Sequence, residues 1–300
     1  MIATTPEQPG PGPLPTEALR ALDLTVGRRL RGLLAGDYRS HEHGDGVELA
    51  QLRPYEPGDD VRMIEWNVTA RTAIPHVRVN LAERELVTWL LLDASPSMHF
   101  GTADRRKADV AAGVALAVGH VGTRRGNRLA VSTFGGDKRI ERPPQQGRHG
   151  LVSLLETLQQ PPRQEGGGAT SLGAALSRLA PVAQQRGVVV VVSDFRGPLD
   201  WRRPLLQLLG RQQVLAVEVR DPREQELPDV GELWLVDPET GRQVRVDTRS
   251  ATIRDRFAEA AHKERTAVAR VLAALAVPHV VLSTQGEWLR PLARFLGARR

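Results

Sequence analysis

Oxygen-bearing side chains in three separate segments could hold a metal ion. Asp93, Ser95 and Ser97 alternate along one segment, and Thr170 and Asp194 stand in two others. Mg²⁺ takes oxygen ligands in octahedral geometry, at about 2.1 Å, and usually keeps several waters. If the three hydroxyls bind directly and the two carboxylates act through water, the ion keeps much of its positive charge. It would then attract a carboxylate from outside, so these residues predict a cation-dependent adhesion site rather than a hydrolytic one.

The surrounding pattern predicts the elements that must bring these segments together. Residues 86–93 and 187–194 are near-continuous apolar runs that each end in aspartate, as in strands buried on both faces of a parallel sheet. We expect a doubly wound, mainly parallel α/β sheet, in which ligands bind at the carboxyl ends of the strands. The other expected elements are strands at 128–134, 213–219 and 279–283, helices at about 105–121, 150–158, 172–185, 205–210 and 250–275, a terminal helix, a strand partner around 138–141, and a hairpin at 232–246 with its turn at Pro238–Gly241.

The order and intervals of these residues resemble the metal-ion-dependent adhesion site of von Willebrand factor A domains. The resemblance covers about residues 85–300. In that family two serines and a threonine coordinate the ion, two aspartates act largely through water, and an acidic residue of a partner protein completes the shell. The resemblance therefore implies Mg²⁺, or another divalent cation such as Mn²⁺ or Ca²⁺, held by Asp93, Ser95, Ser97, Thr170 and Asp194.

Two positions depart from the pattern of that family, and one alternative stays open. The usual Gly-Thr is Ala169-Thr170 here, and the usual Asp-Gly is Asp194-Phe195, which reshapes the rim of the site without removing a ligand. The alternative is that Ser95 and Ser97 only cap the following helix and that Asp194 only makes a turn. Serine and aspartate are common in caps and turns.

The stretch before this domain is similar to a bacterial family known as domain of unknown function 58 (DUF58). Its members typically carry a von Willebrand A-like domain after this stretch, and the family commonly occurs with MoxR-type AAA+ ATPases. The resemblance implies an adaptor or chaperone-like partner of such an ATPase. Glu65 stands where an aspartate is usual. The matching positions are Gly36, Ser40, Arg53, Tyr55, Gly58, Asp59, Asp60, Arg62, Ile64, Trp66, Ala70 and Arg71.

Two interpretations of the charged residues in this stretch remain. They could form a docking face, or they could pair locally around a capped turn while Trp66 lies in the core; we favour local pairing, because charge networks usually stabilise geometry. The residues concerned are Arg53, Tyr55, Asp59, Asp60, Arg62, Trp66 and Arg71. The predicted organisation is a disordered tail at 1–15, an N-terminal helix/strand region at 16–84 with a helix at about 16–34, and the α/β domain at 85–300.

Composition excludes several classes of protein. The chain of 300 residues has no cysteine, so disulfides, zinc-thiolate sites and cysteine nucleophiles are ruled out. The formal net charge is +6, but lysine occurs only at Lys107, Lys138 and Lys263, and the arginines are interleaved with acids. Aromatic residues make up 4%, too few for a base-stacking surface, so we expect no nucleic acid partner. We expect neither a secretion signal nor a membrane span, and hence a cytoplasmic protein.

The remaining motifs are weaker. We read the segment His41-Glu42-His43, with Asp45, as a solvated loop rather than a metal site. The run at 166–168 is glycine-rich but lacks the Gly-Lys-Ser/Thr of a P-loop. A metal-dependent hydrolase or phosphotransferase stays open as an alternative function, with His99 or Glu56 as the general base it would need. A pure scaffold is the third alternative. We expect a protein-binding adaptor that is not an enzyme.

Overall fold

The computed structural model describes residues 10–12, 49–80, 86–124, 126–136, 138–159 and 171–297. The chain divides into two compact units, of which the smaller spans Arg31–Glu85 and the larger contains Leu86–Arg300. Each unit is described by itself. The helix expected at 16–34 and the segment at 41–45 lie outside the described residues, as do Gly36, Ser40 and the glycine run at 166–168.

The small unit is an antiparallel strand pair with two short helices in the connection. Its elements are β1 (Leu49–Pro54), the 3-10 helix η1 (Val61–Met63), α2 (Trp66–Thr72) and β2 (His76–Asn80). Strand pairing places Arg53 opposite Val77. Asp60 caps η1 by accepting a hydrogen bond from the Arg62 amide, 2.9 Å, so the aspartate caps a helix as the sequence suggested.

The large unit contains a six-stranded, mainly parallel sheet, which confirms the predicted mixed α/β class. The strands follow the order β10-β7-β6-β3-β4-β5, and all pair in parallel except β4 with β5. The bounds are β3 (Val87–Asp93), β4 (Arg128–Phe134), β5 (Glu141–Gln146), β6 (Gly187–Ser193), β7 (Gln212–Arg220) and β10 (His279–Ser283). Because β3 and β6 are neighbours, their carboxyl ends lie side by side.

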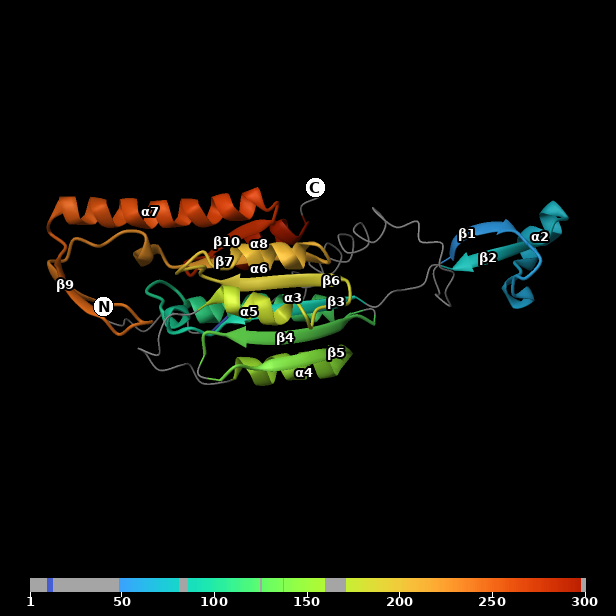
Figure 1. The fold of residues 1–300 in the computed structure, drawn as a ribbon, viewed down its shortest axis with the longest axis horizontal. Helices are drawn as coiled ribbons and strands as arrows, with labels where there is room; N and C mark the ends of the chain where they lie inside the picture. The colour runs from blue at the N-terminus through green and yellow to red at the C-terminus, as the bar shows by residue number, and fades with distance from the viewer. Residues whose placement is uncertain are drawn as a thin grey trace. The chain divides into compact units, whose positions relative to one another are not determined.

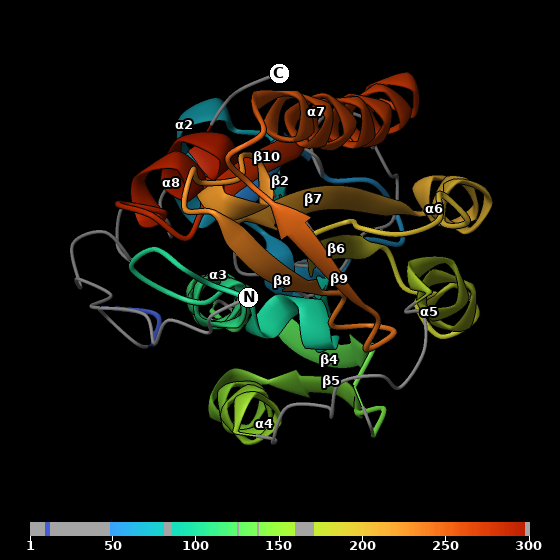
Figure 2. The ribbon, with the colours of Figure 1, turned by 90° about the vertical axis from the view of Figure 1, so that its left-hand side faces the viewer.

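Helices cover both faces of this sheet (Figures 1 and 2). Alternate residues of the central strand β3 enter two different cores. Leu90 packs with helices α3, α4 and α8 on one face, and Leu91 packs with helices α5, α6 and α7 on the other. This alternation is the pleat of a strand buried on both sides. The bounds are α3 (Lys107–Gly122), α4 (Gly147–Leu158), α5 (Leu172–Leu179), α6 (Arg202–Leu209), α7 (Ala251–Ala274) and α8 (Leu289–Gly297).

Some predicted elements differ in their limits, among them β5 and α5. The antiparallel partner of β4 is β5, which begins at Glu141, so the strand lies later than the predicted 138–141. It contains Pro143 and Pro144, which an edge strand tolerates because its outer side needs no hydrogen-bond donors. The helix α5 ends at Leu179 rather than at residue 185, because Pro181 cannot continue a helix.

A separate hairpin lies between β7 and α7 in the chain of the large unit. Its strands are β8 (Glu232–Val236) and β9 (Gln243–Asp247), and the 3-10 helix η3 (Pro222–Glu224) precedes it. The turn connects Val236 to Gln243 and contains Pro238–Gly241, as predicted. In Figure 2 the hairpin crosses in front of the strands of the sheet.

Part of the predicted N-terminal tail is described. Residues 10–12 contact the large unit, where the indole Nε1 of Trp288 donates a hydrogen bond to the carbonyl of Pro11, 3.0 Å. The other residues of the tail, 1–9 and 13–15, lie outside the described residues.

Candidate functional site

The loop after β3 brings one carboxylate and two hydroxyls together. Asp93 ends the strand, and one of its oxygens, Oδ1, accepts a hydrogen bond from the Ser95 amide, 2.9 Å. The short helix η2 (Pro96–His99) then turns the chain back, so the hydroxyl oxygens of Ser95 and Ser97 lie 3.0 Å apart. All three side chains are buried.

The end of the neighbouring strand β6 supplies the second carboxylate. Ser193 ends β6, and its hydroxyl donates to Asp93 Oδ2, 2.6 Å. Asp194 follows directly, and the Ser97 hydroxyl hydrogen-bonds its carboxylate. The structure therefore brings Asp93, Ser95, Ser97 and Asp194 into one buried polar cluster, while Thr170 lies outside the described residues.

The two aspartates of this cluster differ in their acidity. Burial raises the pKa of Asp93 to about 7, and the negative charge of Asp194 adds to the rise. Burial also opposes the ionisation of Asp194, but the ammonium of Lys107 outweighs it and holds the pKa of Asp194 below its ordinary value. A nearby cation would therefore stabilise the ionised form of Asp93 more than that of Asp194, which Lys107 already stabilises.

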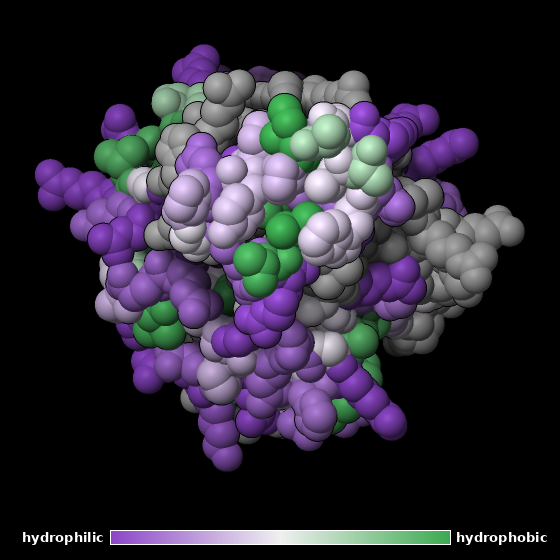
Figure 3. Space-filling model, turned by 90° about the vertical axis from the view of Figure 1, so that its right-hand side faces the viewer, coloured by the Kyte–Doolittle hydropathy of each residue, from purple (hydrophilic) through white to green (hydrophobic). Residues whose placement is uncertain are grey.

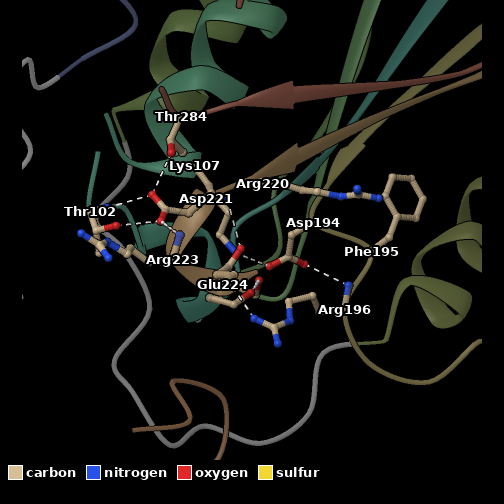
Figure 4. Close-up of polar contacts among 12 residues, drawn as sticks. Thr102, Lys107, Asp194, Phe195, Arg196, Arg220, Asp221, Arg223, Glu224 and Thr284 are labelled. Carbon is tan, nitrogen blue, oxygen red and sulfur yellow. Dashed lines mark hydrogen bonds and ion pairs between the residues drawn. The ribbon is translucent and has the colours of Figure 1, made fainter. Parts of the chain in front are cut away.

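The sequence did not reveal Lys107 as a member of the cluster. Its side chain is fully buried, and its Nζ lies 2.6 Å from Asp194 Oδ2 and 2.6 Å from Glu224 Oε1 (Figure 4). These two carboxylates raise the pKa of Lys107 against the opposing effect of burial, so the lysine stays charged. The available signal was its position at the start of a helix in a chain with three lysines.

Arg196 and Phe195 complete the support around Asp194. The Arg196 amide donates to Asp194 Oδ1, 3.1 Å, and its guanidinium Nη1 donates to Glu224 Oε1, 3.0 Å. Phe195 has a φ of 53°, the left-handed conformation that favours glycine, where the adhesion-site pattern usually has glycine. The cost of about 1 kcal/mol is offset by burial of the ring, which packs edge-on against Trp201 at 5.8 Å.

A second buried carboxylate anchors the elements around the cluster. Asp221, after β7, accepts hydrogen bonds from the Thr102 amide, 2.9 Å, and from the hydroxyls of Thr102 and Thr284, both 2.7 Å (Figure 4). It ties the segment before α3 to the ends of β7 and β10. Burial opposes its ionisation, but these bonds and one from the Arg223 amide keep its pKa below the ordinary value.

The described residues fit a small divalent cation. In an octahedral Mg²⁺ shell with bonds of about 2.1 Å, adjacent oxygens lie about 3.0 Å apart, and the hydroxyls of Ser95 and Ser97 have that separation. Asp93 adds a carboxylate whose raised pKa a cation would lower. Within the described ranges, no three His, Asp or Glu side chains gather as a metal cluster, so this donor set depends on hydroxyls.

A cavity of about 1390 Å³ opens over the cluster. It is larger than the roughly 300–1,000 Å³ of most small-molecule pockets, so it suits a polypeptide segment. The cavity is lined by the four site residues that the structure describes, by His99 and Phe195, and by Leu233 and Leu235 of the hairpin. Burial, followed by the charge of Arg106, lowers the pKa of His99. Glu56, the other base considered, belongs to the small unit.

The hairpin turn also touches the site. Glu239 Oε1 accepts a hydrogen bond from the Ser97 amide at 3.1 Å, although the two residues are far apart in the sequence. The sequence predicted this hairpin and its turn, but nothing in the spacing of its residues indicated which loop the turn would meet.

In the small unit, the charged residues pair locally. Arg53 forms a two-pronged ion pair with Asp59, at 2.6 and 2.8 Å, and Arg62 pairs with Asp60 at 2.8 Å. The Arg71 side chain donates to the carbonyl of residue 67 within its own helix, 3.3 Å. The Tyr55 amide bonds the carbonyl of residue 75, 2.8 Å.

The expectation that Trp66 lies in the core is wrong, because its side chain is 69% exposed. Two strands and a two-turn helix cannot enclose an indole, and Val77 is the single buried hydrophobic residue between positions 52 and 78, where side-chain burial is described. Val61 and Ile74 are also exposed. In the space-filling view of Figure 3, hydrophobic residues stand among hydrophilic ones.

The described residues thus form a mixed α/β protein with a polar site at the carboxyl edge of a mainly parallel sheet. The chain belongs to the family described as "Protein of unknown function DUF58", which matches residues 51–267. It is 42% identical over 283 residues to the uncharacterized protein Rv1480 of Mycobacterium tuberculosis H37Rv, covering 94% of this chain and 89% of that one. An uncharacterized protein of Mycobacterium bovis matches equally well.

The solved structures that match this chain are more distant. The conserved hypothetical protein BatB from Bacteroides thetaiotaomicron is 13% identical, with a TM-score of 0.44, and the match covers 70% of this chain and 97% of that chain. A von Willebrand factor type A protein from Catenulispora acidiphila is 13% identical, with a TM-score of 0.36 over 75% of this chain and 42% of that chain. In the described part of this chain, no helix has both the length and the apolar character to cross a membrane.

Proposed function

We propose that this protein is a non-catalytic adaptor that binds a partner protein through a divalent cation, with its larger unit acting as a von Willebrand A-like domain. Mg²⁺, or Mn²⁺ or Ca²⁺, would be held by Asp93, Ser95, Ser97, Thr170 and Asp194. The convergence of one carboxylate and two hydroxyls in the loop after β3 carries this proposal. The strand order, with helices on both faces and aspartates at the ends of adjacent strands, supports it.

When bound, the cation would supply positive charge for an acidic side chain of the partner. Hydrogen bonds from other residues of this chain position the two aspartates of the site. Lys107 and the Arg196 amide each donate a hydrogen bond to one oxygen of Asp194. Because both oxygens are already bonded, Asp194 suits a role in which it contacts the cation through a water molecule. Asp93 is held by Ser95 and Ser193 on its two oxygens. The cavity gives room for a polypeptide segment beside these residues.

We extend the proposal to the partner, a MoxR-type AAA+ ATPase or its client, in chaperone-like assembly or maturation. The resemblance of the N-terminal stretch to the DUF58 pattern supports this assignment. Trp66, Val61 and Ile74 are exposed and give the small unit apolar side chains for contact with such a partner.

Calorimetric titration of the chain with Mg²⁺, Mn²⁺ and Ca²⁺ tests the cation. We expect binding by the wild type and by Asp255→Ala, a control that removes an exposed carboxylate on α7, and loss of binding in Asp93→Ala with an unchanged circular dichroism spectrum. Affinity purification from the native cell, with Mg²⁺ and then with chelator, tests the partner. Capture that persists in chelator and in Asp93→Ala would refute the adaptor proposal.

A hydrolase or phosphotransferase is the second candidate, because His99 lines the same cavity and its lowered pKa keeps it available as a base. Turnover of generic phosphate or ester substrates, lost in both His99→Ala and Asp93→Ala, would favour this function over the adaptor. Absence of turnover with intact cation binding would favour the adaptor.

A further inference from the structure

The tip of the β8–β9 hairpin occupies the approach to the candidate cation site. Glu239 Oε1 accepts the hydrogen bond of the Ser97 amide, 3.1 Å, within the loop that carries the site hydroxyls. Glu239, Leu233 and Leu235 line the same cavity as the site, and the hairpin crosses in front of the sheet in Figure 2. A carboxylate of this chain therefore lies against the loop to which the proposed function brings a partner's carboxylate.

The turn holds this carboxylate in a defined position. Asp237 Oδ1 accepts a hydrogen bond from the Glu239 amide, 3.0 Å, and Asp237 Oδ2 accepts one from the Thr240 hydroxyl, 2.5 Å. The Gly241 amide closes the turn onto the Asp237 carbonyl, 2.8 Å, with a φ of 71° that glycine adopts without strain. The turn therefore holds Glu239 in a defined position, unlike a surface side chain on an unstructured loop.

The base of the hairpin is fixed, whereas its tip is not part of the main sheet. At the base, the Thr248 amide bonds the Gly231 carbonyl, 2.8 Å, and Arg254 Nη1 donates to the Thr248 carbonyl, 2.6 Å. The two strands form a sheet of their own, apart from the six-stranded one. An isolated two-stranded hairpin is marginally stable in water, so the position of the tip depends on its few contacts with the cavity wall.

We propose that the β8–β9 hairpin is a movable strap that closes the cation site from within the chain, with Glu239 as the internal occupant that a partner's carboxylate displaces. This inference rests on the proposed function, because the bound cation is what would hold either carboxylate. With the cation present and no partner, the strap stays closed. A partner must therefore compete with a tethered glutamate, which limits capture of weakly matching acidic segments.

Residue-resolved hydrogen exchange of the full chain, with and without Mg²⁺, tests the strap. Removing the acceptor of a charge-assisted hydrogen bond should speed exchange of the Ser97 amide by about tenfold or more in Glu239→Ala. Glu232→Ala is the matched control, since Glu232 lies on the same hairpin and pairs with Arg245 at the surface. Mg²⁺ should slow exchange at the Glu239 and Gly241 amides in the wild type and in this control, and leave Glu239→Ala unaffected.

Two results would overturn the strap and leave the cation site intact. One is equal exchange of the Ser97 amide in wild type and Glu239→Ala. The other is calorimetric binding of Mg²⁺ that leaves the turn amides of the wild type unchanged. If Mg²⁺ does not bind the wild type at all, the proposed function fails and the strap fails with it.

Discussion

The buried ammonium of Lys107 compensates two carboxylates beneath the candidate site. Its Nζ contacts Asp194 and Glu224, and all three side chains are nearly or fully excluded from solvent. Taking charges out of water is costly, and here each charge is stabilised by its hydrogen-bonded neighbours. The orientation of Asp194 at the site therefore depends on a lysine from the opposite side of the cluster.

Lys107→Met should destabilise the large unit by about 3–5 kcal/mol, because it leaves Asp194 buried without its cation and removes one of the two cations paired with Glu224. Urea unfolding measures this change. Lys138→Met, at an exposed lysine, is the control and should be neutral. The double variant Lys107→Met/Asp194→Asn should recover part of the loss. Equal stability of the Lys107 and Lys138 variants would contradict this account of the cluster.

Cation affinity should depend on pH through Asp93. A carboxyl with a pKa of about 7 is mostly protonated at pH 6 and mostly ionised at pH 8, so Mg²⁺ should bind about tenfold more weakly at pH 6. Burial lowers the pKa of His99, which reduces the positive charge that this side chain gains at pH 6. Titration calorimetry at both pH values measures the effect, and equal affinities would show that Asp93 does not compete with protons for the ion.

The same shift links the stability of the metal-free protein to pH. The folded-state pKa of Asp93 lies above its ordinary value, so the protonated form contributes stability at low pH that is lost as the pH rises through about 7. Bound Mg²⁺ should remove this loss at pH 8, because it stabilises the ionised carboxylate.

Among the elements, β3 and β6 must run close together to bring their two aspartates to one edge. At the start of β6, a Cβ on Gly187 would lie 2.0 Å from the carbonyl oxygen of Val87 on β3. Real side chains do not approach backbone so closely, so only glycine permits the pairing of these strands at that point.

Gly187→Ala should therefore destabilise the protein by about 1–3 kcal/mol, as overpacking does in tight interiors. Gly210→Ala is the control, because a Cβ there meets nothing closer than 3.8 Å, and it should leave the free energy of unfolding nearly unchanged. Chemical denaturation of both variants compares the two. A harmless Gly187→Ala would mean that the two strands separate easily at this end.

The sequence predicted most elements of the large unit but not every limit. Apolar runs such as 187–194 identify strands buried on both faces, and the Pro238–Gly241 turn identified the hairpin. The position of β5 was missed because Pro143 and Pro144 are typical of loops, and only the place of a strand in the sheet shows that it is an edge.

The site was predictable only in part, for a related reason. Asp93, Ser95, Ser97 and Asp194 stand at the ends of two apolar runs, which predict two strands of one parallel sheet. Contacts between residues distant in the chain, such as Lys107 with Glu224 or Ser97 with Glu239, depend on how helices and loops pack. The prediction that Trp66 is buried was wrong. Large aromatic residues are usually buried, but the small unit has too little structure to cover this one.

At the scale of the whole molecule, the two compact units differ in their cores. The large unit has extensive apolar cores on both faces of its sheet, whereas residues 52–78 of the small unit bury Val77 alone among their hydrophobic side chains. Small units gain little from burial, so the stability of the small unit should be low unless a partner covers its exposed apolar side chains.

Scanning calorimetry should therefore show a main transition from the large unit, with any contribution of the small unit at lower temperature. Mg²⁺ should raise only the main transition, because a ligand stabilises the unit that binds it. Asp93→Ala should abolish this rise, and Trp66→Ala should leave the main transition unchanged. A single transition that shifts in both variants would show that the two units unfold as one.

The two prolines of β5 also limit how the protein can assemble. Pro143 and Pro144 lie at a register shift in the β4–β5 pairing, and neither has a backbone N–H to donate. A strand from a second molecule cannot add to this edge with a continuous ladder. Fibrillar growth through this side of the sheet is blocked, even when copies of the protein crowd together at high concentration.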